Sequence, residues 1–151
     1  MQKAVKLGLG VALATVFATA AFAQVKPDTA IQYRQGIFKA QLWNVLPMAA
    51  MVQGKAPYDQ AAFLLRAQRL DQLSKMAWDG FGPGTDTGAP TKALPAVWSN
   101  AAGFKQAAEA FQAETPKLVA AAQTGNMDQI KAAFGAVTKS CDNCHDNFRG
   151  K

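Results

Sequence analysis

The C-terminal end of the chain carries the sequence Cys141-Asp142-Asn143-Cys144-His145, which is a C-x-x-C-H motif. Two thiols at this spacing can add to the two vinyl groups of one porphyrin, and the histidine that follows can supply an imidazole for the iron. The chain contains no other cysteine and no other histidine, so no other residues compete for this role. The motif therefore predicts a covalently bound haem c with His145 as the axial iron ligand.

Three other uses of the Cys141 and Cys144 pair are weaker interpretations. An exported protein can join two cysteines in a disulfide. A thioredoxin-like site places the pair at the start of a helix that follows a strand, and no strand is expected before Cys141. A zinc site needs four ligands, or three and a water, and it would not explain why the histidine directly follows the second cysteine. Haem attachment explains all three residues.

The first 23 residues are predicted to form a cleavable secretory signal peptide. Two lysines precede an apolar run from Leu7 to Phe22, and small residues flank a cleavage site before Gln24. The alternative is a transmembrane anchor, but the run is short and rich in alanine, whereas a stable span needs about 20 strongly apolar residues. The chain is therefore expected to consist of a signal peptide, residues 1–23, and one domain, residues 24–151, exported to the periplasm.

Composition narrows the classes of function. Half of the 151 residues are hydrophobic, which is enough for the core of a single domain. Loss of the two signal-peptide lysines lowers the formal net charge from +6 to +4, and the remaining positive charges are dispersed. Basic and aromatic residues do not alternate, so neither nucleic acid nor a membrane is expected as a partner. A weakly basic surface leaves an acidic protein partner open.

Apolar residues recur at intervals of three and four, which predicts helices and no sheet. The first helix is expected from Pro27 to Val52, with a kink at Pro47 and a stop near Gly54. The second is expected from Pro57 to Ala77. Residues 79–90 hold many glycines and prolines and are expected to form a long loop that covers the edge of the haem.

Two further helices complete the predicted fold. The third is expected to begin at Pro95 or Ser99 and to run to Ala122, with a bend at Pro116. The fourth is expected to start at Asn126, whose pairing with Gln129 resembles a capping box, and its apolar face includes the haem motif. Four helices with mostly short connections predict an all-α fold, an antiparallel four-helix bundle.

These features together resemble the cytochrome c′ family, the high-spin class II c-type cytochromes. The resemblance covers Gln24 to Lys151 and rests on the position of the haem motif near the C-terminus and on three short segments. These are Tyr33-Arg34-Gln35, Phe81-Gly82-Pro83-Gly84-Thr85 and Pro95-Ala96-Val97-Trp98. The resemblance implies an up-down-up-down bundle with covalent haem c, and a periplasmic protein that is usually a homodimer packed through its first two helices.

The resemblance also implies an iron with one protein ligand and a vacant sixth position that binds nitric oxide and carbon monoxide. The residues that match haem contacts in the family are Arg34, Gln35, Phe38, Thr91 and Arg149. Phe38 matches the position over the open iron face, where its ring is expected to weaken carbon monoxide binding. Arg34 and Gln35, and with less support Thr91, match positions beside the haem propionates, while Arg149 is near the proximal imidazole.

Each of these residues also has a simpler interpretation. Phe38 can be a core residue of the first helix, and Arg34 can belong to a solvated helix face. Arg149 can act only as a cation that complements the C-terminal end of the last helix.

No methionine is expected to coordinate the iron. Low-spin relatives take their methionine ligand from early in the first helix, and residues 30–40 contain none. Met48 follows Phe38 by ten residues, which is about 15 Å along a helix. All four methionines of the mature chain are therefore expected to fill the core.

Three functions follow from these expectations. The first is nitric oxide binding, for sequestration or detoxification. The second is electron transfer with an unknown redox partner. The third, a peroxidase, is least favoured because it requires a distal acid–base group and the chain has no distal histidine. The protein is therefore not expected to be an enzyme.

Overall fold

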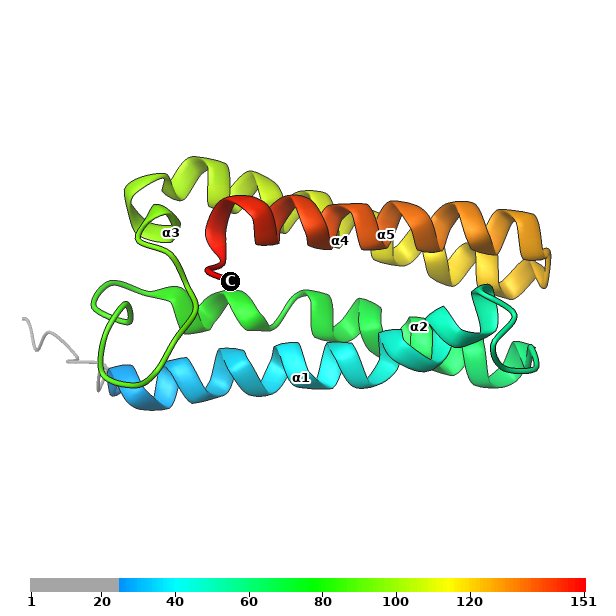
Figure 1. Cartoon of the computed structure of the whole chain (residues 1–151), viewed down its shortest axis with the longest axis horizontal. Helices are drawn as coiled ribbons and strands as arrows, with labels where there is room; N and C mark the ends of the chain where they lie inside the picture. The colour runs from blue at the N-terminus through cyan, green and yellow to red at the C-terminus, as the bar shows by residue number, and fades with distance from the viewer. Residues whose placement is uncertain (1–24) are drawn as a thin grey trace, which may run out of the picture.

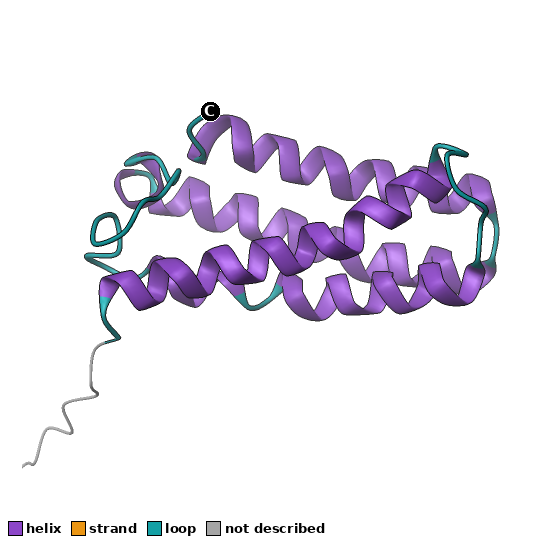
Figure 2. Ribbon diagram, turned by 60° about the horizontal axis from the view of Figure 1, so that its bottom comes forward, coloured by secondary structure: helices purple, strands orange, loops and turns teal. Residues whose placement is uncertain are grey.

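The computed structural model describes residues 25–151, so the predicted signal peptide lies outside the described residues. Figure 1 shows an antiparallel, up-down-up-down bundle, and Figure 2 shows no strand among the described residues. Its long helices are α1 (Pro27–Val52), α2 (Gln60–Ser74), α4 (Ala101–Thr124) and α5 (Met127–Phe148). The short helices η1 (Ala77–Phe81) and α3 (Ala96–Ser99) lie between α2 and α4. The predicted all-α bundle is confirmed, and no helix within residues 25–151 is long and apolar enough to cross a membrane.

Helix α1 has the predicted bounds and continues through Pro47. A proline has no N–H, so the carbonyl of Trp43, four residues earlier, loses its partner within the helix. Arg66 of α2 donates to this carbonyl through Nη1 at 3.3 Å. Figure 2 shows that the first helix changes direction beyond its middle, as expected for a proline kink.

Helix α2 is shorter than predicted at both ends. It begins at Gln60 rather than at Pro57, because the Asp59 carboxylate caps it by accepting a hydrogen bond from the Ala62 N–H at 3.0 Å. It ends at Ser74, where the Trp78 Nε1–H donates to the Ser74 carbonyl at 2.6 Å and the chain tightens into η1. The predicted continuation to Ala77 is therefore wrong.

The predicted third helix is divided into α3 and α4. Asn100 has a non-helical conformation, with φ −121° and ψ 55°, and its side-chain oxygen accepts a hydrogen bond from the Gly103 N–H at 3.2 Å. Asn100 is thus the N-cap of α4. Helix α5 begins where predicted, since the Asn126 side chain caps the N–H groups of Asp128 and Gln129.

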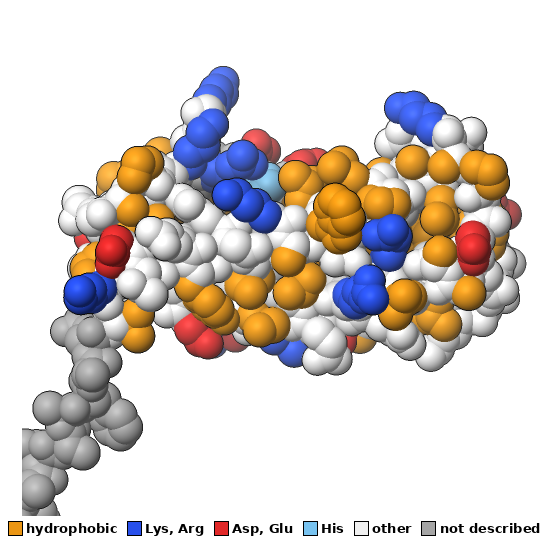
Figure 3. Space-filling model, turned by 90° about the horizontal axis from the view of Figure 1, so that it is seen from below, with side chains coloured by type: hydrophobic (Ala, Val, Ile, Leu, Met, Phe, Trp, Pro, Cys, Tyr) orange, Lys and Arg blue, Asp and Glu red, His pale blue; other side chains and the backbone are white. Residues whose placement is uncertain are grey.

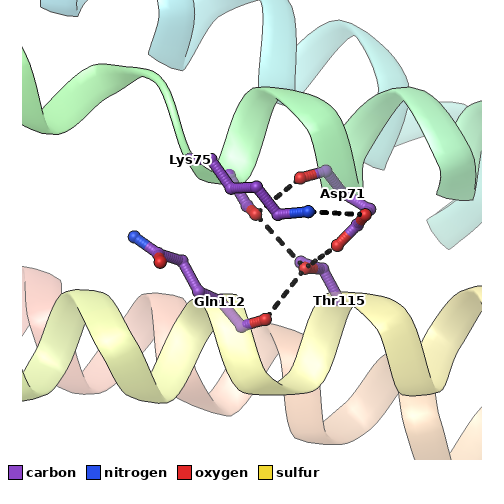
Figure 4. A network of polar contacts seen from close by, with 5 residues as sticks. Asp71, Lys75, Gln112 and Thr115 are labelled. Atoms are coloured by element: carbon purple, nitrogen blue, oxygen red, sulfur yellow. Dashed lines mark hydrogen bonds and ion pairs between the residues drawn. The ribbon is translucent and has the colours of Figure 1, made fainter.

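A polar network joins α2 to α4 beside Pro116 (Figure 4). The fully buried Thr115 hydroxyl donates to the Asp71 carboxylate at 2.8 Å and lies 3.4 Å from the Gln112 carbonyl, which Pro116 deprives of its N–H partner. Lys75 pairs with Asp71 at 3.2 Å. The network fixes the position of α2 against α4 near the middle of the bundle.

The main hydrophobic core lies between α2, α4 and α5, and the buried face of α1 includes polar side chains. Arg34, Gln41 and Asn44 are buried on α1, whereas the apolar Leu42 is 53% exposed. Met48 is completely buried, as expected for core filling, but Met76 is 41% exposed. The prediction that every methionine fills the core is thus wrong for Met76.

Candidate haem site

A cavity of about 610 Å³ opens between α1, η1, α4 and the C-terminal half of α5. In Figure 1, α5 runs along the upper side of the bundle and α1 along the lower side. The cavity is lined by every residue predicted to contact the haem. These are Arg34, Gln35, Phe38, Thr91, Cys141, Cys144, His145 and Arg149. Helix α5 thus brings the attachment motif to the cavity, with Arg149 directly after its end, and α1 and the loop after η1 bring the other predicted residues.

The thiols of Cys141 and Cys144 lie on the face of α5 that lines the cavity, and both are free. Residues three and four apart share a helix face, which is why Cys141, Cys144 and His145 reach the same space. Burial, together with the negative charge of Asp142, raises the pKa of the Cys141 thiol to about 11. Burial also raises the pKa of the Cys144 thiol, so both cysteines are protonated at neutral pH in this geometry.

The surroundings of His145 favour the neutral form of its imidazole. Partial burial and the nearby Arg149 cation lower the pKa of His145, and the opposing effects of Asp142 and Asp146 are smaller. A neutral imidazole is the form that binds a metal. Backbone geometry also orders this turn, because the Arg149 N–H donates to the His145 carbonyl at 3.1 Å.

Aromatic rings make up the apolar wall across from the motif. The Phe38 ring lies edge-on to the rings of Trp78 and Phe81, with centroid distances of 6.1 and 6.2 Å. Further aromatic residues line the cavity from α4 and α5. These are Phe104, Phe111 and Phe148. Helical periodicity does not distinguish a cavity wall from a core, so the sequence did not predict that Phe104 and Phe111 line the site.

Arg34 is 2% exposed, so the interpretation of this residue as part of a solvated helix face is wrong. Its Nη1 donates to the Gly80 carbonyl at 2.7 Å and to the Thr85 hydroxyl at 3.1 Å, and its Nη2 donates to the Thr91 hydroxyl at 3.0 Å. The guanidinium also lies 4.4 Å from the centroid of the Phe81 ring. Burial lowers the pKa of Arg34, although Asp86 opposes this shift. Arginine nevertheless stays charged at neutral pH.

Gln35 is also engaged with the protein, because its Nε2 donates to the Pro90 carbonyl at 2.9 Å. Together with Arg34, this contact holds the glycine-rich loop over one end of α1. The predicted long loop is thus ordered against the bundle and begins after η1, at Gly82.

Cations surround the mouth of the cavity. Lys39, Lys92 and Arg149 line it, and Lys92, Arg149 and Lys151 line an adjoining hollow that also reaches His145. Figure 3 shows lysine and arginine side chains gathered beside the histidine. None of these cations forms an ion pair with a carboxylate of residues 25–151. Such a mouth suits the carboxylates that a porphyrin carries.

Neither the ligand cluster of a zinc site nor a methionine ligand for the iron is found among the described residues at this site. The described residues contain no group of three or more His, Cys, Asp or Glu side chains placed to hold a metal ion, as a zinc site would require. No methionine of the described residues lines the cavity, so none is placed there to offer a sulfur to iron.

The cavity fits a haem c in volume and chemistry. Cofactor sites usually occupy about 300–1,000 Å³ and have mostly apolar walls with a few placed polar groups. Two thiols and a neutral imidazole on one helix, aromatic walls and a cationic mouth meet these requirements. The fold and the motif together define a class, a c-type haem protein built on a four-helix bundle.

Comparisons with known proteins identify the family. The family model described as Cytochrome C' matches residues 29–149. The chain is 48% identical to cytochrome c' of Rubrivivax gelatinosus over 126 residues, covering 83% of this chain and 98% of that protein. It is 44% identical to cytochrome c' of Alcaligenes xylosoxydans xylosoxydans over 126 residues, covering 83% of this chain and 97% of that protein.

Solved structures agree with this result. The crystal structure of cytochrome c' from Rubrivivax gelatinosus matches with a TM-score of 0.80, covering 83% of this chain and 98% of that one. A nitric oxide complex of a variant cytochrome c prime from Alcaligenes xylosoxidans matches with a TM-score of 0.78 and 43% identity, covering 84% of this chain and 98% of that one. The chain belongs to the cytochrome c′ family, and its cofactor is haem c.

Proposed function

We propose that this protein is a periplasmic, five-coordinate haem c protein that binds nitric oxide and carries out its sequestration or detoxification. In this proposal, Cys141 and Cys144 attach the haem and His145 is the one protein ligand of the iron. The observation that carries the proposal is the composition of a single cavity. The motif lies on α5, Phe38 lies on α1, and no methionine of the described residues lines the walls.

When bound, haem supplies an iron that bonds diatomic gases directly. The protein contributes the surroundings. His145 offers an imidazole, and the wall around Phe38 is aromatic, with its one indole N–H, that of Trp78, donated to the Ser74 carbonyl rather than to the cavity. Dioxygen needs a polar donor to stabilise its partial charge, whereas nitric oxide bonds to iron without one. The wall therefore favours nitric oxide, and the bulk of Phe38 weakens carbon monoxide binding.

A non-enzymatic role is supported by the polar groups near Phe38. A peroxidase needs a group that is free to move protons beside the iron. Arg34 donates to Gly80, Thr85 and Thr91, and Gln35 donates to the Pro90 carbonyl. Both side chains are thus committed to structural hydrogen bonds.

Absorption spectra of the reduced holoprotein, recorded before and after addition of each gas, test the proposal. We expect a high-spin five-coordinate spectrum that changes fully with nitric oxide and only at high pressure with carbon monoxide. A low-spin spectrum that neither gas changes would reject the vacant sixth site.

The cationic mouth supports a second candidate function, electron transfer with an acidic redox partner. Lys39, Lys92 and Arg149 surround the opening and would steer such a partner. Steered association weakens as salt screens the charges. If this function holds, the rate of electron exchange with an acidic redox protein falls steeply with ionic strength, and reversal of the charge at Lys92 reduces that dependence.

We also propose that the protein is a homodimer packed through α1 and α2. Three large apolar side chains of α1 are exposed within five residues: Leu42 by 53%, Trp43 by 73% and Leu46 by 59%. Leu65 of α2 is exposed by 46%. Figure 3 shows hydrophobic side chains gathered on the face that is seen from the side of α1. An apolar surface of this kind is typical of an interface.

A further inference from the structure

The Thr91 hydroxyl joins two parts of the protein that are distant in sequence. Its Oγ1 accepts one hydrogen bond from Arg34 Nη2 at 3.0 Å and another from the Ala93 N–H at 3.2 Å. A hydroxyl oxygen has two lone pairs, so both acceptor positions are occupied. Thr91 thus links α1 directly to the backbone of residues 92–94, the segment that follows Thr91.

That segment is paired with the C-terminal end of the chain. Ala93 forms an antiparallel bridge with Arg149. Two backbone hydrogen bonds flank the bridge, from the Leu94 N–H to the Phe148 carbonyl at 2.9 Å and from the Gly150 N–H to the Lys92 carbonyl at 2.8 Å. The Arg149 N–H also donates to the carbonyl of His145. Residues 92–94 are therefore hydrogen-bonded to the last turn of α5, where His145 lies.

The other end of this connection is rigid. Arg34 is buried, bonded to η1 through the Gly80 carbonyl and packed on the face of Phe81. A buried, charged donor with several partners has little freedom to move, and its hydrogen bonds are stronger than those between neutral groups. Arg34 can thus hold Thr91 in place, although Thr91 itself is only half-buried.

We propose that Arg34 and Thr91 are positioning residues for the iron ligand, because through residues 92–94 they fix the turn that orients the His145 imidazole. The proposal deepens the proposed function and rests on His145 being the ligand. Groups beyond the first ligand commonly set the orientation and the strength of a metal-bound histidine. Here the supporting contacts reach the backbone of the ligand's turn rather than its ring.

Thr85 provides a matched control for Thr91. Both hydroxyls accept one hydrogen bond from Arg34, at 3.1 and 3.0 Å, but only Thr91 also accepts from Ala93. The variants Thr91→Val and Thr85→Val therefore each remove one bond to Arg34 with the same change of side-chain shape, and Thr85→Val also removes the bond that the Thr85 hydroxyl donates to the Gly82 carbonyl at 2.8 Å. Only Thr91→Val cuts the connection to the C-terminal turn.

Two measurements on the holoprotein test the proposal. The first is hydrogen exchange of the Leu94 and Gly150 amides, which form the bridge. We expect Thr91→Val to accelerate it roughly 5- to 30-fold, the factor that corresponds to loss of one or two kcal/mol, and Thr85→Val to leave it unchanged. The second is the iron–imidazole stretching frequency of the ferrous protein. We expect it to shift in Thr91→Val and to stay at the wild-type value in Thr85→Val.

The outcomes separate this proposal from the proposed function. Absence of any iron–imidazole band from the wild-type spectrum would overturn the proposed function, because a five-coordinate ferrous iron with His145 as its one protein ligand should show this band. With that band present, an unshifted frequency in Thr91→Val, whether or not exchange accelerates, would limit Thr91 to a structural role. Equal effects of the two valine variants would also overturn the connection through residues 92–94.

Discussion

At the scale of single residues, Phe38 is the side chain whose bulk decides which gases reach the iron in the proposed site. It is half-buried, lines the cavity and is supported edge-on by Trp78 and Phe81. We predict that Phe38→Ala strengthens carbon monoxide binding on the order of tenfold, because a clash of about 1.4 kcal/mol corresponds to that factor in a binding constant. The affinity is measured by titrating the reduced holoprotein.

The outcome for Phe38 also separates its two interpretations. If Phe38 is only a core residue, Phe38→Ala lowers the free energy of unfolding but leaves the carbon monoxide affinity at the wild-type value. Phe104→Ala is a suitable control, because Phe104 lines the cavity from α4 rather than from α1.

Arg34 shows why parts of the site were beyond prediction from residue patterns. The partners of its guanidinium, Gly80, Thr85 and Thr91, are 46 to 57 residues further along the chain. Helix periodicity indicates which face is buried only when that face is apolar. The haem motif, by contrast, is local, so Cys141, Cys144 and His145 were assigned to one helix face from their spacing alone.

At the scale of elements, the contact between η1 and α1 depends on the absence of a side chain at Gly80. A Cβ added there would lie 2.8 Å from the Ala30 carbonyl oxygen and 2.8 Å from the Arg34 Cβ, and neither atom is at the end of a flexible side chain. We predict that Gly80→Ala lowers the free energy of unfolding by about 1–3 kcal/mol, the usual cost of overpacking. Urea unfolding of the holoprotein measures the change.

Gly82 offers the matched control for Gly80. A Cβ at Gly82 meets no atom within 4 Å, and its backbone, with φ −59° and ψ 169°, suits any residue. Gly82→Ala should therefore leave the free energy of unfolding unchanged or raise it by up to about 1 kcal/mol, because alanine lowers the conformational entropy of the unfolded chain. Equal destabilisation by both alanine variants would contradict the close approach of η1 to α1.

The ends of the helices were predictable where a proline or glycine and the pattern of side chains indicate the same boundary. Helix α1 begins at Pro27 and ends just before Gly54, which has φ +68°, as its sequence indicates. Elsewhere a capping side chain and another feature of the sequence indicate different boundaries, and the capping side chain sets where the helix begins. Asp59 caps α2 with a carboxylate although Pro57 precedes it, and Asn100 interrupts a run that periodicity alone treats as one helix.

At the scale of the whole molecule, α1 contributes side chains both to the cavity and to the exposed apolar surface. Phe38 and Arg34 line the cavity, and Trp43 and Leu46 are exposed to solvent. Pro47 and Arg66 hold the turn of Trp43 against α2. A partner subunit on this surface would thus bury side chains of the same helix that lines the site.

We predict that Trp43→Glu converts a dimer into a folded monomer. The side chain is 73% exposed, so the substitution disturbs no internal contact of consequence, while a charge in an apolar interface would lack a partner. Sedimentation velocity gives the mass, and circular dichroism checks that the helices are intact. Val25→Glu is the control, because Val25 is also exposed, by 60%, but precedes α1. A monomeric wild-type protein, or a dimer that both Trp43→Glu and Leu46→Glu leave intact, would place no interface on this face of α1.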